Sequence, residues 1–322
     1  MRMKHLVCAG LACALTYVAT PVKAADTIEM GLIGSANAVE WPYYVAVQKG
    51  FFADAGIMPD IIYVSTAPGL VQQLAAGSLD TVDIGVVEPI HAVARGAPVA
   101  ILRITGGVPP YELLAKSTIK SIKDLKGHTV VIGGMLDINR VYLERVLKAA
   151  GLKDSDIDIT VIGNTAGRFA AIKSGAADMT MLAPPFNFFA EAAGFNNVGM
   201  MIDYAKDLVF GSTDVSLAFA SKHHDTVVRF VAALNKSVAW FNNDANRDAA
   251  IDILAKEMKT SNRDDVAKSY DYIRKIGFFP NDGAVSRKSL ETLMGEMAAL
   301  GDTNGKVPFD KLLLPGVTKT RD

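Results

Sequence analysis

Cysteine is almost absent from this 322-residue chain. Its two cysteines, Cys8 and Cys13, both lie in an apolar stretch at the N-terminus. That stretch is typical of a removable signal. The rest of the chain then has no thiol to form a disulfide, to bind a metal as a thiolate or to attack a substrate. The absence suits export to an oxidising compartment, where an unpaired thiol is a liability.

Residues 1–24 have the three parts of a secretory signal peptide. Arg2 and Lys4 supply a positive start, residues 6–18 form an apolar run, and residues 22–24 (VKA) offer small side chains at a cleavage site. The apolar run is shorter than the roughly 20 residues that a membrane-spanning helix needs. We therefore expect cleavage after Ala24 and a periplasmic protein, with an uncleaved membrane anchor as the alternative.

A large excess of charge of either sign is also missing. The net charge is −1, and removing the three positive charges of residues 1–24 leaves −4. We therefore expect no nucleic-acid partner and no membrane-surface partner. Catalytic motifs are missing too. The four histidines beyond the signal have no i, i+4 pair, and there is no Gly-x-Ser-x-Gly, phosphate loop or complete dinucleotide fingerprint. We expect no metal and no cofactor.

Strand-like and helix-like segments alternate along the first two thirds of the chain. Helices are expected where an apolar stripe begins at a capping residue and stops at glycine. The expected strands are 27–33, 61–64, 84–87, 99–104, 129–132, 159–162 and 179–182, and the expected helices are 42–50, 70–76, 91–95, 139–150, 169–173 and 188–192. This alternation is typical of mostly parallel sheets covered by helices.

The alternating pattern runs twice, and the two halves share one short similarity. Residues 83–89 (DIGVVEP) align with residues 178–184 (DMTMLAP), and each follows a helix that opens at Thr-Ala. In this alignment Glu88 corresponds to Ala183. Two similar α/β units predict two lobes with a crevice between them. Beyond about residue 215 we expect a tail that packs around the first lobe, with a strand at 217–221 and helices at 226–242, 248–258, 264–275 and 286–299.

Ligands of open α/β sheets bind beyond the carboxyl ends of the strands. The rule selects segments from both halves: 35–44, 66–69, 88–89, 133–140, 165–168 and 183–186. Thr66, Asp137 and Thr165 are suitable N-caps for the helices that begin there, and helix N-termini attract anions. Arg140 and Arg168 fall in first turns, where positive charge is unfavourable by about 0.3–1 kcal/mol. An anionic ligand would remove that cost, and two solvated arginines are the alternative.

Aromatic side chains and one carboxylate lie near the same strand ends. Trp41 and Tyr43 stand at the start of the first helix, and Phe186 follows the turn that contains Pro184. Flat rings suit the clamping of a flat ligand body, with core packing as the alternative for each ring. Glu88 has no basic neighbour in sequence, so it is suited to accept a hydrogen bond from a ligand amine or hydroxyl.

Four stretches of the chain resemble a known group of proteins. They are residues 43–56 (YYVAVQKGFFADAG), 73–77 (QLAAG) with Asp83, 121–130 (SIKDLKGHTV), and 174–178 (SGAAD) with 183–186 (APPF). They resemble the periplasmic binding proteins for nitrate, aliphatic sulfonates, taurine and thiamine-pyrimidine precursors, over most of residues 27–205. The resemblance implies a type II two-lobe periplasmic binding protein fold. In it each lobe is a mostly parallel sheet flanked by helices, and two crossing strands join the lobes.

The resemblance also implies a domain division, partners and a site. The first lobe would be residues 25–107 and 209–322, and the second residues 108–208. The partners would be a small-molecule ligand and the permease of an inner-membrane ABC importer, with a monomeric protein and no catalysis. Ligand contacts carry over by position onto Trp41, Tyr43, Pro68, Glu88, Asp137, Arg168 and Pro184. With Met135, Asn139, Arg140 and Phe186 from the same strand ends, these residues form the candidate site.

The sequence leaves the identity of the ligand open. The leading hypothesis is a small organic anion, a sulfonate or an aliphatic or aromatic carboxylate, held by Arg140, Arg168 and helix N-termini. The alternative is a pyrimidine-like heterocycle between Trp41 and Tyr43, with Glu88 reading its polar edge. Two alternatives belong to other functional classes: the chain would be a periplasmic enzyme, or a sensor subunit that presents its ligand to a receptor. One branch of the resembled family makes a thiamine pyrimidine with a cysteine-rich motif, which is missing beyond residue 24.

Overall fold

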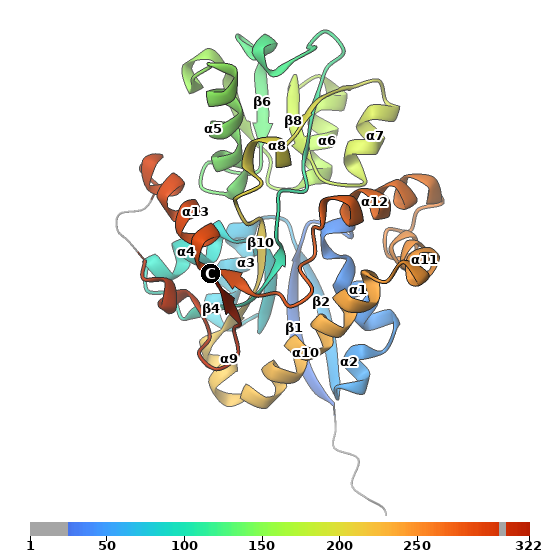
Figure 1. The fold of residues 1–322 in the computed structure, drawn as a ribbon, viewed down its shortest axis with the longest axis vertical. Coiled ribbons are helices and arrows are strands. Elements are labelled where there is room, and N and C mark those ends of the chain that lie inside the picture. The colour runs from blue at the N-terminus through green and yellow to red at the C-terminus, as the bar shows by residue number, and fades with distance from the viewer. Residues whose placement is uncertain (1–24, 303–306) are drawn as a thin grey trace, which may run out of the picture.

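The computed structural model describes residues 25–302 and 307–322, so the predicted signal peptide lies outside the described residues. The described chain forms two lobes stacked along the long axis of the molecule, each built on a five-stranded sheet (Figure 1). Helices pack against both sheets. The predicted α/β class and the two-lobe arrangement are therefore confirmed.

The first sheet has four parallel strands and one antiparallel strand. Its order is β2 (Ile57–Val64), β1 (Asp26–Ile33), β3 (Thr81–Gly85), β10 (Gly211–Ser216) and β4 (Val99–Gly106). Strand β10 runs antiparallel to both of its neighbours. The helices of this lobe that precede residue 100 are α1 (Trp41–Gln48), α2 (Phe51–Asp54), α3 (Ala67–Ala76) and α4 (Val87–Ala94). We call this unit the first lobe.

The second sheet repeats that arrangement. Its order is β7 (Asp158–Val161), β6 (Thr129–Ile132), β8 (Met179–Leu182), β5 (Glu112–Ala115) and β9 (Asn196–Met200), with β5 antiparallel to both neighbours. Its helices are α5 (Ile138–Ala150), α6 (Thr165–Ser174), α7 (Phe186–Ala192) and α8 (Ile202–Ala205). We call this unit the second lobe. Strands β5 and β9 were not predicted. β5 follows no helix, and β9 carries the polar residues Asn196 and Asn197 in place of an apolar run.

Two connections join the lobes, one between β4 and β5 and one between β9 and β10. The expected lobe boundaries, after residues 107 and 208, fall within these two connections. Each connection delivers an antiparallel strand into the middle of a sheet, β5 into the second and β10 into the first. The carboxyl ends of the parallel strands of both sheets consequently face each other across the gap between the lobes (Figure 1).

Burial on both faces explains why the central strands read as unbroken apolar runs. All four residues of β8 are buried, as are the first four of β3, because helices cover both sides of each sheet. One close approach depends on glycine. A Cβ at Gly31 of β1 would lie 2.5 Å from Leu70 Cδ2, so the missing side chain allows α3 to pack directly on the sheet.

The tail beyond β10 is helical, as expected, with one correction. Residues 217–221 were predicted as a strand and instead form α9 (Leu217–Lys222). A five-residue apolar run does not distinguish strand from helix, and β10 ends directly before it. The remaining elements are α10 (His224–Phe241), α11 (Arg247–Glu257), α12 (Arg263–Ile276) and α13 (Arg287–Ala299), with the small strands β11 (Val285–Ser286) and β12 (Thr320–Arg321).

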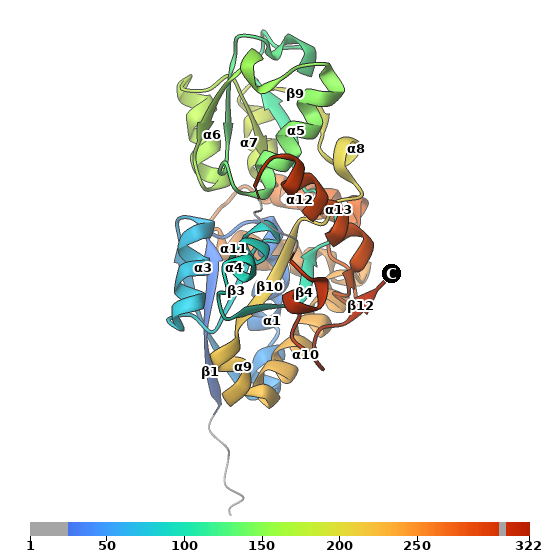
Figure 2. The same cartoon turned by 90° about the vertical axis from the view of Figure 1, so that its left-hand side faces the viewer.

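The tail contacts both lobes, whereas the sequence predicted contact with the first lobe alone. Phe188 of α7 packs on Tyr272 of α12 at 6.2 Å between ring centroids. Arg145 of α5 forms an ion pair with Glu296 of α13, with 2.9 Å between Nη2 and Oε1. Helices α12 and α13 thus sit at the junction of the lobes, as Figure 2 shows. In the described part of the chain, no helix is long and apolar enough to cross a membrane.

Candidate ligand-binding site

A cavity lies between the two lobes, at the carboxyl ends of their parallel strands. It encloses roughly 670 Å³ free of protein atoms, part of it open to solvent. The first lobe lines it with residues that follow β1, β2 and β3, and the second lobe with residues that follow β6, β7 and β8. We call it the inner cavity. Its principal polar and aromatic lining residues are Asn37, Glu88, Tyr111, Asp137, Asn139, Asn164, Arg168, Phe186 and Phe210.

Equivalent capping residues open the helices on the two sides of the inner cavity. Asn37 accepts from the backbone N–H of Val39, and its counterpart Asp137 accepts from the N–H groups of Asn139 and Arg140. Thr66 caps α3, as predicted. Thr165 was predicted to cap α6, but Asn164 does so, through a 2.8 Å bond from the N–H of Gly167 to its Oδ1. The choice between two adjacent capping residues is not resolved by residue type alone.

Glu88 is the most deeply placed carboxyl of the inner cavity. It lies in the first turn of α4 and not at a strand end as predicted, and 6% of its surface is exposed. Burial raises the pKa of the Glu88 carboxyl well above its usual value, and the Asp137 carboxylate raises it further. Its Oε2 atom is buried without a hydrogen-bond partner among the described residues. An unpaired buried oxygen is costly, so this atom is suited to a ligand group.

Asp137 faces Glu88 from the second lobe. Burial raises the pKa of Asp137 to about 7, against the lowering effect of Arg168 and of two backbone N–H groups. Two buried carboxyls of raised pKa in one cavity do not both ionise near neutral pH, because like charges repel strongly in a low dielectric. A second negative charge in the inner cavity is therefore disfavoured.

Asn139 and Tyr111 add neutral polar groups. Asn139 is 3% exposed and donates from Nδ2 to the Tyr111 hydroxyl at 3.4 Å. The Asn139 Oδ1 atom, like Glu88 Oε2, is buried and unpaired within the described structure. Tyr111 comes from the connection between β4 and β5, and nothing in the sequence around Pro109 and Pro110 predicted its role. Two acceptors from opposite lobes are thus available to one ligand.

Among the described residues, Arg168 is the one arginine that lines the inner cavity. It is 2% exposed, and its three nitrogens donate to the carbonyls of Met181 and Ile162 and to Thr165 Oγ1, at 3.2–3.3 Å. Its guanidinium also lies 5.8 Å from the centre of the Tyr111 ring. These bonds fix the side chain, and a guanidinium still has one further N–H on each terminal nitrogen. Arg168 therefore offers a fixed positive charge to a ligand.

The structure places Trp41 and Tyr43 in the core of the first lobe, which corrects the prediction that they face the cleft. Both are fully buried. Trp41 donates from Nε1 to the carbonyl of Ala250 at 2.8 Å and packs on Phe241. The Tyr43 hydroxyl bonds to Asp83 at 2.5 Å. Helix α1 is apolar on every face, so the sequence does not reveal which side chains turn inward.

Four other predicted residues do not line the inner cavity. Arg140 is paired with Asp154 at 2.5 Å and with Glu144 at 3.4 Å. Pro184 is buried, and its carbonyl accepts from the N–H of Ala38 of the first lobe at 3.3 Å. Pro68 and Met135 are exposed near the strand ends. Of the predicted site, the structure brings together Glu88, Asp137, Asn139, Arg168 and Phe186.

The strand register corrects the alignment of the two halves. Met30 pairs with Thr81 in the first sheet, and Val130 pairs with Met179 in the second. Asp80 and Asp178 precede these partners, and each accepts a bond from the neighbouring strand, from the N–H of Glu29 or of Thr129. The true match to Asp178 is therefore Asp80 and not Asp83. The signal was the spacing after the helix-ending glycine, because Gly77 precedes Asp80 by three residues just as Gly175 precedes Asp178.

No cluster of metal-ligating side chains occurs in residues 25–302 or 307–322. The lining residues of the inner cavity provide carboxyl, amide, phenol and guanidinium groups around an aromatic wall. These groups are suited to bind the polar edge of a small molecule through hydrogen bonds and charge.

Comparison with known protein families shows which family the chain belongs to. The model of the NMT1/THI5-like family matches residues 37–247, more than half of the chain. The protein belongs to the NMT1/THI5-like family. Several of its curated relatives and structural neighbours are named as binding proteins.

Its curated relatives differ in their ligands. It is 26% identical over 261 residues to the formylaminopyrimidine-binding protein of Halalkalibacterium halodurans, covering 78% of this chain and 77% of that protein. It is 32% identical over 122 residues to a putative aliphatic sulfonates-binding protein of Escherichia coli, covering 37% of this chain and 38% of the relative.

Solved structures share the fold at low identity. The ligand-binding component of an ABC-type import system from Staphylococcus aureus matches with a TM-score of 0.78 at 14% identity, covering 90% of this chain and 97% of that one. The periplasmic aliphatic sulphonate-binding protein SsuA from Escherichia coli matches at 0.71 and 20% identity, over 92% and 94%. The fold also hosts an enzyme, because the desulfurization enzyme DSZB matches at 0.67 and 18%, over 91% and 97%.

Proposed function

We propose that this protein is the periplasmic solute-binding component of an ABC importer, and that it captures a small molecule bearing N–H donors, such as an amino-substituted heterocycle. The observation that carries the choice is the pair of buried, unpaired acceptors, Glu88 Oε2 and Asn139 Oδ1, on opposite walls of the inner cavity within the described structure. A ligand with two N–H groups would satisfy both. The relative that binds a formylaminopyrimidine supports this chemistry.

A small organic anion is the second candidate, and Arg168 favours it. The guanidinium is buried and fixed at the wall of the inner cavity, where an arginine offers a planar, two-pronged partner for a sulfonate or carboxylate. The sulfonate-binding relative supports this alternative. A sulfonate has acceptors only, so it would leave Asn139 Oδ1 unpaired, and we rank it second for that reason.

The remaining parts of the proposal concern compartment, partner and chemistry. Residues 1–24 would direct export and be removed. Residues 25–107 with 209–322, and residues 108–208, would form the two lobes that close on the ligand. The closed protein would deliver the ligand to the permease as a monomer, without transforming it. Recovery of an unaltered ligand from the purified complex, and one monomeric species on sedimentation, are the expected results.

The ligand choice is tested by calorimetric titration with two probes, 4-aminopyrimidine and methanesulfonate. Glu88→Met keeps the length of the side chain but removes both oxygens. We expect it to weaken 4-aminopyrimidine about tenfold, the equivalent of one lost hydrogen bond of about 1.4 kcal/mol, and to leave methanesulfonate unchanged. Arg168→Gln is the reciprocal variant. If methanesulfonate binds and depends on Arg168 while 4-aminopyrimidine does not bind, the second candidate replaces the first.

A further inference from the structure

A second, more open cavity adjoins the inner one. It is lined by Gly34, Ser35, Ala36, Tyr63, Phe186, Glu257, Met258 and Lys259. Three of these residues, Gly34, Ser35 and Phe186, also line the inner cavity, so the two spaces share a wall. We call it the outer cavity. It encloses roughly 1000 Å³, much of it open to solvent.

The outer cavity presents flat and flexible apolar surfaces at its mouth. Tyr63 on β2 is 42% exposed, Phe186 opens α7, and Met258 is the residue that ends α11. The two rings come from opposite lobes, and methionine adapts to irregular partners. Glu257 and Lys259 carry opposite charges at the rim. A flat, uncharged group fits this surface better than an ion does.

A chain of hydrogen bonds ties the two cavities together. Asn37, in the wall of the inner cavity, donates to Glu40 at 3.1 Å, and Tyr44 donates to the same Glu40 oxygen at 2.6 Å. The Tyr63 hydroxyl then donates to the Tyr44 hydroxyl at 3.2 Å. The Tyr63 ring is therefore held in a fixed position relative to the inner cavity, although its face is open to solvent.

Lys259 adopts a backbone conformation that its side chain disfavours. Its φ is 52°, the one positive φ among the described non-glycine residues. Other helices that end in the left-handed conformation use glycine there, as α3 does at Gly77 and α5 at Gly151. A lysine at such a position costs conformational energy that glycine avoids. Strained residues of this kind gather at ligand sites, and an ammonium beside an aromatic ligand gains a cation–π interaction.

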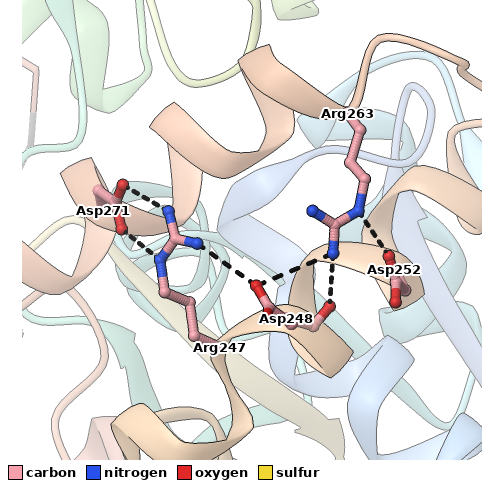
Figure 3. Close-up of polar contacts among 5 residues, drawn as sticks. All are labelled: Arg247, Asp248, Asp252, Arg263 and Asp271. Atoms are coloured by element: carbon pink, nitrogen blue, oxygen red, sulfur yellow. Dashed lines mark hydrogen bonds and ion pairs between the residues drawn. The ribbon is translucent and has the colours of Figure 1, made fainter.

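Ion pairs fix the helical hairpin that carries Met258 and Lys259. Arg263, at the start of α12, bonds to Asp252 at 2.8 Å and to the carbonyl of Asp248 at 3.4 Å on α11. Arg247 holds Asp271 through two bonds of 2.9 and 2.7 Å, as Figure 3 shows. These bonds hold α11 and α12 against each other, and Arg263 attaches the α12 side of the turn to α11.

We propose that the outer cavity is a second subsite of the same ligand, and that it takes an aromatic arm attached to the polar head held in the inner cavity. This inference rests on the proposed function. The arm would pass Gly34 and Phe186 and lie among Tyr63, Met258 and Lys259. The transported solute would then be a two-part molecule, larger than the head that the inner cavity holds.

Paired probes separate the two subsites. One pair is 4-aminopyrimidine and 5-benzyl-4-aminopyrimidine, and the other is methanesulfonate and 3-phenylpropane-1-sulfonate. In whichever pair binds, we expect the aromatic member to have at least a tenfold lower dissociation constant by calorimetry, because the arm buries apolar surface in the outer cavity.

Variants then locate the arm. Tyr63→Ala and Met258→Ala are expected to abolish most of that advantage and to change the affinity of the head-only probe less than twofold. Met58→Ala is the matched control, because Met58 lies on the same strand as Tyr63, is 58% exposed and lines neither cavity. It should leave both members of the pair unchanged.

The outcomes distinguish the two proposals. Binding of a head-only probe with no gain from the aromatic arm overturns the second subsite and leaves the proposed function standing. A gain that survives Tyr63→Ala and Met258→Ala also overturns it, because the arm then lies elsewhere. If neither pair binds at millimolar concentration, the proposed ligand classes fail, and the second subsite fails with them.

Discussion

Glu88 and Phe186 occupy equivalent positions in the two lobes. Glu88 follows Thr81 by seven residues, Phe186 follows Met179 by seven, and Thr81 and Met179 are the equivalent register partners of β1 and β6. Both residues lie in the first turn of a helix, and both line the inner cavity. The duplicated framework therefore aims a carboxyl from one side and an aromatic ring from the other at the same space.

The raised pKa of Asp137 predicts a pH-dependent stability. Its pKa rises from 3.8 to about 7 on folding, so the folded protein binds more protons than the unfolded chain between these values. The free energy of unfolding should therefore fall as pH rises from about 4 to about 7, by at most about 1.4 kcal/mol per pH unit from this group. Asp137→Asn retains a good N-cap and should reduce this slope without removing it, because burial also raises the pKa of Asp83, to about 6. Urea unfolding across that pH range measures the slope.

Asp178 is a control for this prediction, because its pKa is shifted in the opposite direction to that of Asp137. Burial alone would raise its pKa, but hydrogen bonds from Lys116, from the N–H of Thr129 and from His128 lower the pKa to about 2. The stability from this group is present above pH 4 and is lost as pH falls toward 2. Asp178→Asn should thus leave the slope between pH 4 and 7 intact. A slope in Asp137→Asn equal to that of the wild type would contradict the assignment.

Trp41 should matter for folding and not directly for ligand contact. Its ring is fully buried against Phe241 and Tyr270. We expect Trp41→Ala to lower the free energy of unfolding by about 3–5 kcal/mol, as for other large core truncations. Phe186→Ala, at the wall of the inner cavity, is expected to cost less stability and to weaken ligand binding instead. Urea unfolding measures the stability of both variants, and calorimetry measures their ligand affinity. A loss of affinity in Trp41→Ala with little loss of stability would show that Trp41 contacts the ligand.

The substitution Gly34→Ala tests how closely the two lobes approach each other at the inner cavity. Its φ is 71°, and a Cβ there would lie 3.1 Å from Asn164 Cβ of the opposite lobe. Gly50 is a matched control, because its φ is 74° and a Cβ added there would meet no described atom within 4 Å. Both alanine variants should lose about 1 kcal/mol of stability from the left-handed backbone. Gly34→Ala alone should weaken ligand binding, and equal affinities in the two variants would show that the added methyl does not hinder closure.

Lys259→Gly should make the protein more stable. Glycine adopts the left-handed conformation without the Cβ clash, so we expect a gain of about 0.5–1 kcal/mol in the free energy of unfolding. The same change should reduce the advantage of an aromatic arm about threefold. Lys259→Ala removes the ammonium but keeps the backbone strain, so it separates the two effects. A Lys259→Gly protein without a stability gain would show that the turn relaxes in other ways.

Hydrophobic periodicity predicted the α/β class and most elements, because strands buried on both faces and helices closed by glycine leave strong patterns. The two lobes followed from the repetition of that pattern, and the type II arrangement followed from the family resemblance. The site was only half predictable. Glu88, Asp137, Asn139, Arg168 and Phe186 were predicted because they lie at strand ends and helix starts, and the structure places all five at the inner cavity.

The rest of the site depends on tertiary contacts between residues that are far apart in the sequence, and local sequence patterns do not reveal these contacts. Tyr111 and Phe210 line the inner cavity from the connections between the lobes, and these have no helix or strand period of their own. Trp41 was misplaced because the orientation of α1 about its axis is set by tertiary packing on α10 and α11. Arg140 was misassigned because its partner Asp154 lies in a later turn, invisible from the first turn of α5.

The position of β10 also sets the order in which the molecule is completed during synthesis. This strand, Gly211–Ser216, lies between β3 and β4, which emerge from the ribosome more than a hundred residues earlier. The lobe that starts first is thus the one that finishes last. Until β10 arrives, β3 and β4 cannot join into one sheet, and the N-terminal portion keeps open sheet edges.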